Sequence, residues 1–295
     1  MAAGPHPTPR SLNQATPRSI RERKSPIPMT SYTPQELFLS TAPYYARFRP
    51  GYDPALYKLL ASRFGLDGTQ QVLDLGTGTG VLALPLAELV ANVIAVDPET
   101  GMLDQGRQLA AERGITNIDW RAGDSTTLAT MDLPPLHLTV MGATFHWMDR
   151  DQVLRDLDQL VLPGGGVVLA SGGAKHETIT PPPWADIVTE IRSHYLGSER
   201  RAGSGTYTHP KERHQDVLAR SPFSQVEVTH WDRVHTRTLD EVIGYQFSLS
   251  YSSPAQLGNY KNAFEQDLRK ALTEAQPDGV FEELIRTEAI IGTRP

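Results

Sequence analysis

Three carboxylates in the first half of the chain stand at or just beyond the ends of short apolar segments. Asp74 lies in the segment 72–75, Asp97 follows the segment 92–96, and Asp124 comes shortly after the segment 117–121. Apolar runs of this length are typical of buried strands. Because the carboxyl ends of parallel strands meet at one edge of a sheet, we expect the three acids to surround one crevice and to accept hydrogen bonds from a ligand.

A glycine-rich turn follows Asp74, since residues 76–80 read Gly-Thr-Gly-Thr-Gly. A strand, a glycine turn and a helix let a ligand approach the backbone, and both dinucleotides and S-adenosylmethionine use this geometry. Val81 stands where the dinucleotide spacing would place its third glycine. Asp74 would repel a pyrophosphate and attract an ammonium group. Charge therefore favours S-adenosylmethionine, and a dehydrogenase is the disfavoured alternative.

The other two acids match the remaining parts of such a cofactor. Asp97 follows Gly76 by 21 residues, the place from which an acid accepts hydrogen bonds from ribose hydroxyls in nucleotide folds. Asp124 is placed to accept a hydrogen bond from the adenine amino group, and Met102 is expected beneath the adenine ring. Taken singly, each acid could instead cap a helix or form a turn. The three in this order favour the cofactor site.

The elements that must position these residues alternate along the chain. Strand patterns and helix patterns follow one another up to residue 171, which predicts an α/β, Rossmann-like, mostly parallel sheet with helices on both faces. The predicted strands are 72–75, 92–96, 117–121, 136–141 and 167–171, and the predicted helices are 53–64, a segment ending at 89, 99–113 and 151–160.

The sequence divides into four predicted parts. Residues 1–30 hold six prolines and are expected to be a disordered, basic extension. Residues 31–171 hold N-terminal lid helices, one of them starting near Thr33, and the cofactor-binding core. Residues 172–224 form a cap or substrate insertion with a helix at 184–195. Residues 225–295 add strands at 225–236 and 288–293 and further lid helices at 239–247 and 255–272.

Composition narrows the function further. The chain has no cysteine, which excludes disulfides, thiolate-bound metals and thiol nucleophiles. The whole chain has a net charge of −6. Its first 30 residues carry five basic side chains and one acidic one, a net charge of +4, so residues 31–295 have a net charge of −10. Acidic globular parts bind nucleic acid poorly. We expect a cytoplasmic protein with a small-molecule substrate, no nucleic acid, no membrane segment and no metal, and a homodimer is left open.

The sequence resembles the class I S-adenosylmethionine-dependent methyltransferases. VLDLGTGTG at 72–80, VIAVDPETGML at 93–103, AGD at 122–124 and LPGGGVVL at 162–169 carry the resemblance. It implies a seven-stranded sheet with one antiparallel strand near its edge. YYARFRPGY at 44–52 and TFHWMD at 144–149 resemble the small-molecule branch that includes trans-aconitate methyltransferase and natural-product tailoring enzymes.

This resemblance and the order of the acids give a set of predicted site residues. The cofactor contacts are Tyr45, Asp74, Gly76, Thr77, Gly78, Gly80, Asp97, Met102, Asp124 and Ala143. His146 is the candidate general base, because it follows the fourth strand and an unperturbed histidine has a pKa of about 6.5. The alternative is that His146 only shapes its loop. The predicted substrate contacts are Tyr52, Trp147, Arg192 and Tyr251. Tyr52 and Trp147 could equally be packing residues.

The predicted reaction is in-line methyl transfer to a small molecule, with a hydroxyl or carboxylate acceptor favoured. Two alternatives stay open on the sequence. The same cofactor site could serve a cyclisation, a rearrangement or cleavage of the cofactor, or the chain could be a non-enzymatic interaction subunit that binds the cofactor.

Overall fold

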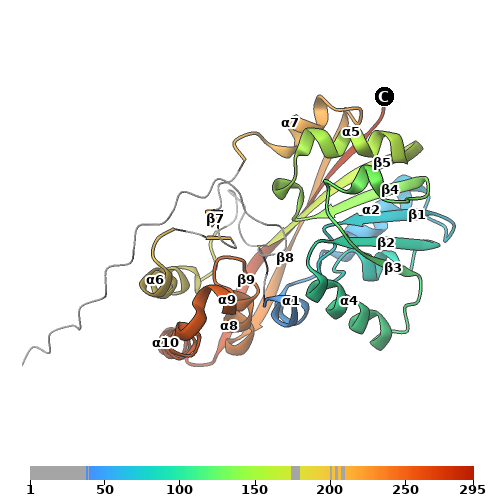
Figure 1. Ribbon diagram of the computed structural model, residues 1–295. Coiled ribbons are helices and arrows are strands. Elements are labelled where there is room, and N and C mark those ends of the chain that lie inside the picture. The colour runs from blue at the N-terminus through green and yellow to red at the C-terminus, as the bar shows by residue number, and fades with distance from the viewer. Residues whose placement is uncertain (1–37, 39, 174–179, 200, 203–204, 207–209) are drawn as a thin grey trace, which may run out of the picture.

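A computed structural model describes residue 38 and residues 40–173, 180–199, 201–202, 205–206 and 210–295. The predicted extension 1–30 and the helix start near Thr33 lie outside the described residues. The chain forms two regions, a core sheet with helices on both faces and a helical lobe at one end of that sheet (Figure 1). No helix within the described ranges is long and apolar enough to cross a membrane.

The core sheet has seven strands in the order β3-β2-β1-β4-β5-β9-β8. The neighbours among β1 to β5 pair in parallel, whereas β9 pairs antiparallel with both β5 and β8. The strands are β1 Gln71–Leu75, β2 Asn92–Asp97, β3 Ile118–Ala122, β4 Leu136–Gly142, β5 Val161–Gly173, β8 Gln225–Thr238 and β9 Val280–Thr293. This confirms the predicted α/β fold with its single antiparallel strand next to the edge.

Two apolar layers enclose the sheet because successive side chains of a strand point to opposite faces. Leu73 faces the layer that includes Leu154 and Leu218, whereas Val72 faces the layer that includes Leu56 and Leu60. The first layer is covered by α5 Arg150–Leu160 and α7 His214–Ala219, and the second by α2 Pro54–Phe64 and α3 Ala83–Leu86. The helix α4 Thr100–Glu112 lies along β2 and β3. Strands buried on both faces explain the nearly continuous apolar runs in the sequence.

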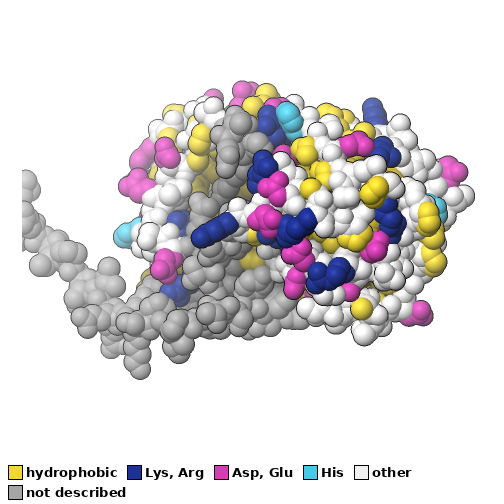
Figure 2. All heavy atoms as spheres, turned by 90° about the horizontal axis from the view of Figure 1, so that it is seen from above, with side chains coloured by type: hydrophobic (Ala, Val, Ile, Leu, Met, Phe, Trp, Pro, Cys, Tyr) yellow, Lys and Arg dark blue, Asp and Glu magenta, His cyan; other side chains and the backbone are white. Residues whose placement is uncertain are grey.

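The helices α5 and α7 are joined by ion pairs on the outside of the core. Arg220 pairs with Asp151 at 2.9 Å and also with Glu212, and Arg150 lies 3.8 Å from Glu212. Figure 2 shows basic and acidic side chains intermixed on the face seen from above. The described part of this face therefore presents a mixed charge pattern.

A second region, the cap lobe, packs around its own apolar cluster. Trp184, Val188, Phe247, Phe264 and Leu268 are buried together in it. The lobe is made of α1 Ala42–Phe48, α6 Ala185–Leu196, α8 Leu239–Phe247, α9 Pro254–Leu257 and α10 Lys261–Ala275, with the short strands β6 Arg201–Ala202 and β7 Gly205–Thr206 in the same stretch of chain as α6. In Figure 1 the helices α6, α8, α9 and α10 of this lobe lie beside the ends of β8 and β9, whereas α1 lies next to α4 of the core. Of the predicted insertion 172–224, α6 joins the lobe and α7 joins the core.

The helix after the glycine turn is shorter than predicted: α3 covers only Ala83–Leu86 and does not continue to residue 89. Beyond Leu86 the chain continues as turns, in which the Leu89 N–H donates to the Leu86 carbonyl at 2.9 Å. At the start of α3, Pro85 has no N–H to bond the carbonyl of Val81, and the Tyr57 hydroxyl donates to that carbonyl at 3.2 Å. The predicted helix 255–272 divides into α9, a 3₁₀ turn and α10 around Gly258, which has φ +51°. Strand β9 begins eight residues earlier than the predicted 288, at Val280.

The indole ring of Trp120 on β3 fixes the glycine turn from behind. A Cβ on Gly80 would lie 2.7 Å from the Cη2 atom of Trp120, and Gly80 has φ +84°. The same ring fills the space beside Gly106 on α4. These two glycines therefore let the turn, α4 and β3 approach one another closely.

We expect Gly80→Ala to lower the free energy of unfolding by about 2–4 kcal/mol, through overpacking and the left-handed backbone together. Urea unfolding measures this change. Gly114→Ala is the matched control, because Gly114 has φ +68° but no atom within 4 Å of the added Cβ. Equal losses for the two variants would show that contact with Trp120 is not the cause.

Candidate functional site

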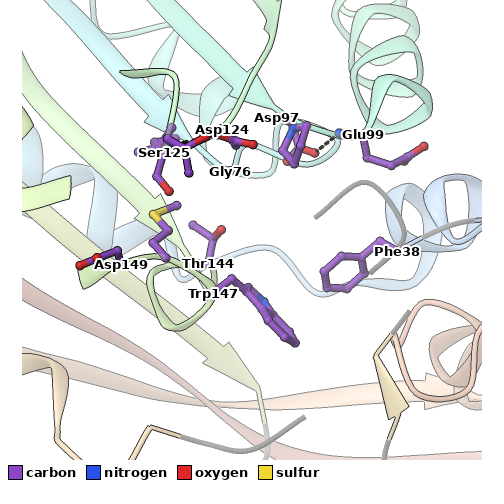
Figure 3. Close-up of a pocket in the computed structure, with 13 residues that line it drawn as sticks. Phe38, Gly76, Asp97, Glu99, Asp124, Ser125, Thr144, Trp147 and Asp149 are labelled. Atoms are coloured by element: carbon purple, nitrogen blue, oxygen red, sulfur yellow. Dashed lines mark hydrogen bonds between the residues drawn. The ribbon is translucent and has the colours of Figure 1, made fainter. Parts of the chain in front are cut away.

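The candidate site is a pocket at the carboxyl edge of the sheet, where the strand order reverses between β1 and β4. It encloses about 720 Å³ of empty space, part of it open to solvent. Figure 3 shows Asp97, Glu99 and Asp124 on one side and Thr144 and Trp147 on the other. The lining residues are Phe38, Leu75, Gly76, Asp97, Pro98, Glu99, Asp124, Ser125, Thr126, Thr144, Trp147, Met148 and Asp149.

The glycine turn forms one wall of this pocket. The N–H groups of Gly76 and Thr77 both donate to the carbonyl of Val96 on β2, at 2.7 and 3.0 Å. Gly76 has φ +75°, and a Cβ there would overlap the Thr144 side chain. At Gly78, by contrast, a Cβ would meet only Tyr45 Cε1 at 3.8 Å. Gly76 and Gly80 are therefore required by the packing of Thr144 and Trp120, whereas the space beside Gly78 is bordered by the Tyr45 ring alone.

Asp74 lies below the turn and is 1% exposed. Its Oδ2 accepts a hydrogen bond from the Thr77 hydroxyl at 2.7 Å, which explains why Thr77 stands in the motif. Burial raises the pKa of Asp74 to about 7, against the opposing effect of the Thr77 hydrogen bond. Such a carboxyl gains its negative charge most readily when a cation is brought close to it.

Asp97 ends β2 and is fixed by two backbone donors. Its Oδ2 accepts from the Gly78 N–H at 2.8 Å and its Oδ1 from the Glu99 N–H at 3.0 Å. Each carboxylate oxygen keeps a second lone pair for a ligand hydroxyl. Burial raises the pKa of Asp97 to about 6, although both backbone hydrogen bonds lower it.

Asp124 lies across the pocket in the turn after β3 (Figure 3). Its Oδ1 accepts from both the N–H and the hydroxyl of Thr126, at 2.8 and 2.5 Å. The three predicted acids are therefore brought to one edge of the sheet, with Asp97 and Asp124 in the pocket wall and Asp74 behind it.

Glu99, Thr144 and Phe38 line the pocket without having been predicted from the sequence. Glu99 caps α4, because its two carboxylate oxygens accept from the N–H groups of Gly101 and Met102 at 3.2 and 3.0 Å. The Asp-x-Glu pattern before a helix was a signal for this second acid. The lining holds Asp97, Glu99, Asp124 and Asp149 and no Lys, Arg or His. The described wall therefore favours a cationic ligand.

Met102 and Ala143 are not in the described lining of the pocket. Met102 is 2% exposed within α4. Ala143 is one of two described non-glycine residues with positive φ, at +52°, and its N–H donates to the carbonyl of Ala170 at 2.7 Å. This left-handed residue turns the chain at the end of β4 into the loop that carries Thr144 and Trp147.

Tyr45 and Tyr52 lie on the cap-lobe side of the glycine turn. The Tyr45 ring is the neighbour of Gly78, and the Tyr52 hydroxyl lies against Gly142 at the end of β4. Burial raises the pKa of both hydroxyls, with smaller contributions from the nearby Asp74 to each. Both rings therefore lie near Asp74, and the predicted contacts of Tyr45 with the cofactor and of Tyr52 with the substrate stay predictions.

His146 and Trp147 belong to the 3₁₀ turn Phe145–Trp147, and only Trp147 lines the pocket. The Trp147 ring meets Phe38 edge-on, with centroids 6.4 Å apart. The His146 ring lies 4.8 Å from Trp147 and stacks toward His214 of α7 at 6.4 Å. The general-base role of His146 stays a prediction, and it requires the ring to serve a substrate beyond the lined pocket.

Arg192 and Tyr251, two predicted substrate contacts, lie next to each other in the cap lobe. The guanidinium of Arg192 is 5.9 Å from the centre of the Tyr251 ring. Arg192 is 4% exposed and donates to the carbonyls of Gly197 and Glu199 beyond the end of α6. Its substrate role also stays a prediction. Among the described residues, no group of acids and histidines could hold a metal ion.

Comparison with known proteins agrees with this geometry. Residues 72–165 match the family described as a methyltransferase domain. An uncharacterized methyltransferase of Schizosaccharomyces pombe is 29% identical over 126 residues, which cover 42% of this chain and 48% of that protein. An uncharacterized methyltransferase of Mycobacterium bovis is 29% identical over 227 residues, covering 75% and 80%. The chain thus spans about half the length of the first of these curated relatives.

A solved structure gives the same fold. A putative type II methyltransferase from Anaeromyxobacter dehalogenans superposes with a TM-score of 0.54 and 18% identity, covering 84% of this chain and 98% of the other. At this identity the likeness concerns the fold, which matches the seven-stranded sheet described above.

Proposed function

We propose that this chain, a class I S-adenosylmethionine-dependent methyltransferase whose methyltransferase domain covers residues 72–165, methylates a small molecule. The single observation that carries the proposal is the acid-lined pocket beside Gly76 of the glycine turn, at the switch point of the sheet. A pocket of this charge attracts a sulfonium and an ammonium group and repels phosphates.

The residues present fit S-adenosylmethionine. Asp97, fixed by two backbone N–H groups, keeps lone pairs for the two ribose hydroxyls. Asp124 is placed to accept from the adenine amino group. The carboxylates of Asp74 and Asp97 would both attract the ammonium group, and the space beside Gly78 would let it approach.

The bound cofactor supplies a methyl group on a positively charged sulfur, which is a good leaving group. The protein therefore has to orient the acceptor and exclude water. The rings of Phe38 and Trp147 line the pocket and remove part of its wall from solvent. A carboxylate acceptor needs no base, whereas a hydroxyl acceptor needs one, for which His146 is our candidate.

The substrate is proposed to enter between the end of β4, where Tyr52 lies, and the cap lobe, where Arg192 and Tyr251 lie. These side chains suit an anionic or aromatic small molecule. The acidic net charge of residues 31–295 supports a small molecule over a nucleic acid. We favour methylation of a hydroxyl or carboxylate.

Calorimetry with S-adenosylhomocysteine tests the cofactor site, and an absence of binding would overturn the proposal. A small-molecule extract incubated with the protein and S-adenosylmethionine then tests the reaction by mass spectrometry. We expect a product heavier than its precursor by one CH₂ unit, with S-adenosylhomocysteine formed in equal amount. A product isomeric with its precursor would instead establish a cyclisation or rearrangement.

Cofactor binding should be coupled to proton release. The pKa of Asp74 is about 7 and that of Asp97 about 6, and a bound cation lowers both because it stabilises the ionised carboxylates. The affinity for S-adenosylhomocysteine should therefore rise from pH 5 toward pH 7 and level off above it. Calorimetry in two buffers of different ionisation enthalpy measures the protons released.

Asp74→Asn is the matched variant for this prediction. Its amide oxygen can still accept from the Thr77 hydroxyl, which now bonds the carboxylate, but the group no longer titrates. We expect weaker binding and fewer protons released near pH 6. Proton uptake on binding by the native protein would contradict the proposed charge arrangement.

A further inference from the structure

The two edge strands of the core sheet differ in length and in how they are protected. The edge strand β3 spans only five residues and carries the Asp119–Arg121 ion pair at 2.6 Å. Arg107 also donates to the Trp120 carbonyl of this strand, at 3.2 Å. The opposite edge strand, β8, spans 14 residues, and no described segment pairs with its outer side. Long edges of this kind recruit another strand, because their N–H and C=O groups can still pair.

The sequence of β8 lacks the features that usually keep an edge strand unpaired. The strand contains no proline, glycine or lysine, and it pairs with β9 without a bulge from Gln225 to Thr238. Seven of its 14 residues are Val, Thr or Trp, the types that favour strands. Val228 and Val234 among them are 46% and 63% exposed. The outer edge of β8 is therefore well suited to pairing.

Exposed apolar side chains gather on one face of the ribbon formed by β8 and β9. Four of the five large hydrophobic side chains that are exposed among the described residues belong to it, namely Val228, Val234, Val280 and Leu284. Val234 lies opposite Leu284, and Val280 lies opposite Thr238. Because every second residue of a strand points to the same side, all four valine and leucine side chains share one face.

The residue pattern of β8 suits antiparallel pairing with a second copy of the same strand. A two-fold axis at Trp231 places Val228 of each copy opposite Val234 of the other, since both lie three residues from the axis. Within each copy, Val234 lies opposite Leu284 of β9, and Val228 lies opposite Ile290. The four adjacent strands would then carry an apolar row made of Leu284, Val234, Val228 and Ile290, and the axis produces this row twice.

Polar side chains also match in this register. Asp232 pairs with Arg286 of β9 at 2.6 Å, and His230 lies opposite Glu288. The same axis places Asp232 of one copy opposite His230 of the other. The row across four strands then reads Arg286, Asp232, His230, Glu288, in which each carboxylate lies beside a basic side chain. Cross-strand pairs of this kind stabilise a sheet, whereas like charges directly opposite each other destabilise it.

Other antiparallel registers that keep the two faces aligned fit less well. An axis at His230 would place Val228 opposite Asp232, and an axis at Asp232 would place that carboxylate opposite its own copy. With the axis at Trp231, no two side chains of the same charge lie opposite each other, and Glu227 lies opposite His235. The sequence of β8 therefore favours one register.

We propose that β8 is a homodimer interface, in which residues 225–237 of two copies pair antiparallel about Trp231 and join the two seven-stranded sheets into one. Such a pairing forms about 12 backbone hydrogen bonds, a number that is common for stable interfaces. A two-fold interface is closed, so the assembly ends at the dimer. Because β5 and β9 separate β8 from β4, the proposal does not depend on the proposed function.

Light scattering coupled to size-exclusion chromatography of the full chain tests the dimer. We expect the native protein to be a dimer at micromolar concentration. Val234→Lys should raise the dissociation constant at least about tenfold, because the axis introduces the ammonium group twice at the paired edge. Val280→Lys is the matched control, since Val280 is 45% exposed on the same face but lies on β9, outside the proposed pairing. Thermal melts of both variants check folding.

Cysteine crosslinking tests the register, because the native chain has no cysteine. The Val228→Cys and Val234→Cys proteins are mixed, allowed to exchange subunits and treated with a short bismaleimide. In the proposed register, position 228 of one copy lies within about 5.5 Å of position 234 of the other, measured between Cβ atoms. Two copies of position 228 would be roughly 20 Å apart, and so would two copies of position 234. We expect a crosslinked dimer in the mixture and none with either variant alone.

Four results would overturn the inference. One is a monomeric native protein, and another is a dimer that Val234→Lys leaves intact, since it would form through a different surface. Equal weakening by Val234→Lys and Val280→Lys would place the interface on the exposed face instead of the edge. Crosslinking of the Val228→Cys protein with itself, without crosslinking in the mixture, would show a register other than the one centred on Trp231.

Discussion

Replacing Asp97 by alanine will lower the affinity for S-adenosylhomocysteine by about 2 kcal/mol or more, which is roughly 30-fold. The carboxylate is held by the N–H groups of Gly78 and Glu99 at 2.8 and 3.0 Å. Its remaining lone pairs are therefore already directed when the ligand arrives. The variant loses the acceptor for two ribose hydroxyls. Burying these hydroxyls without a hydrogen-bond partner costs their full desolvation free energy.

Calorimetry of Asp97→Ala beside Asp104→Ala measures this effect. Asp104 is exposed on α4 and pairs with Arg107, so its removal should change neither binding nor folding appreciably. Because Asp97 also satisfies the backbone of the glycine turn, a thermal melt separates lost binding from lost structure. Undiminished affinity in a folded Asp97→Ala protein would remove Asp97 from the cofactor site.

Replacing Glu283 by alanine will lower the free energy of unfolding by about 3–5 kcal/mol. Arg237 and Glu283 form an ion pair at 2.6 Å in which both side chains are 2% exposed. Arg237 also donates to the Phe48 carbonyl at 3.0 Å and lies 4.4 Å from the centre of the Tyr245 ring. Without Glu283 its charge would remain buried and uncompensated, at the junction of α1, α8 and β9.

Urea unfolding of Glu283→Ala tests this value against Glu227→Ala. Glu227 pairs with Arg63 at the surface, where the side chains are 54% and 35% exposed, so its loss should cost less than about 1 kcal/mol. The double variant Arg237→Met with Glu283→Leu should regain most of the stability, because it removes both charges together. A small loss in Glu283→Ala alone would mean that water reaches Arg237.

The sequence predicted the core sheet well because its signals are local. Strands such as β1 and β2 are buried on both faces and appear as short apolar runs in the sequence. The boundaries of single helices were predicted less well. The helix α3 ends at Leu86 instead of residue 89, and Gly258 divides the predicted helix 255–272.

The site was predicted only in part, because some of its residues are positioned by segments that are distant in the sequence. Asp97 and Asp124 follow strands, so the order of the strands placed them in the pocket. Thr144 and Phe38 depend on how the loop after β4 and the segment before α1 pack against distant segments. Thr144, for example, lies against Gly76, which stands 68 residues earlier in the sequence. The spacing of residues along the sequence does not predict a contact of this kind.

The length of β8 and β9 determines how the cap lobe can move. The two strands pair from Gln225 with Thr293 to Thr238 with Val280, whereas β5 accompanies β9 only as far as Arg286. From there to α8, the connection between core and cap along these strands is a hydrogen-bonded ribbon of two strands. Any displacement of the lobe at this point would require twisting or bending that ribbon, in which the hydrogen bonds between β8 and β9 hold the two strands together.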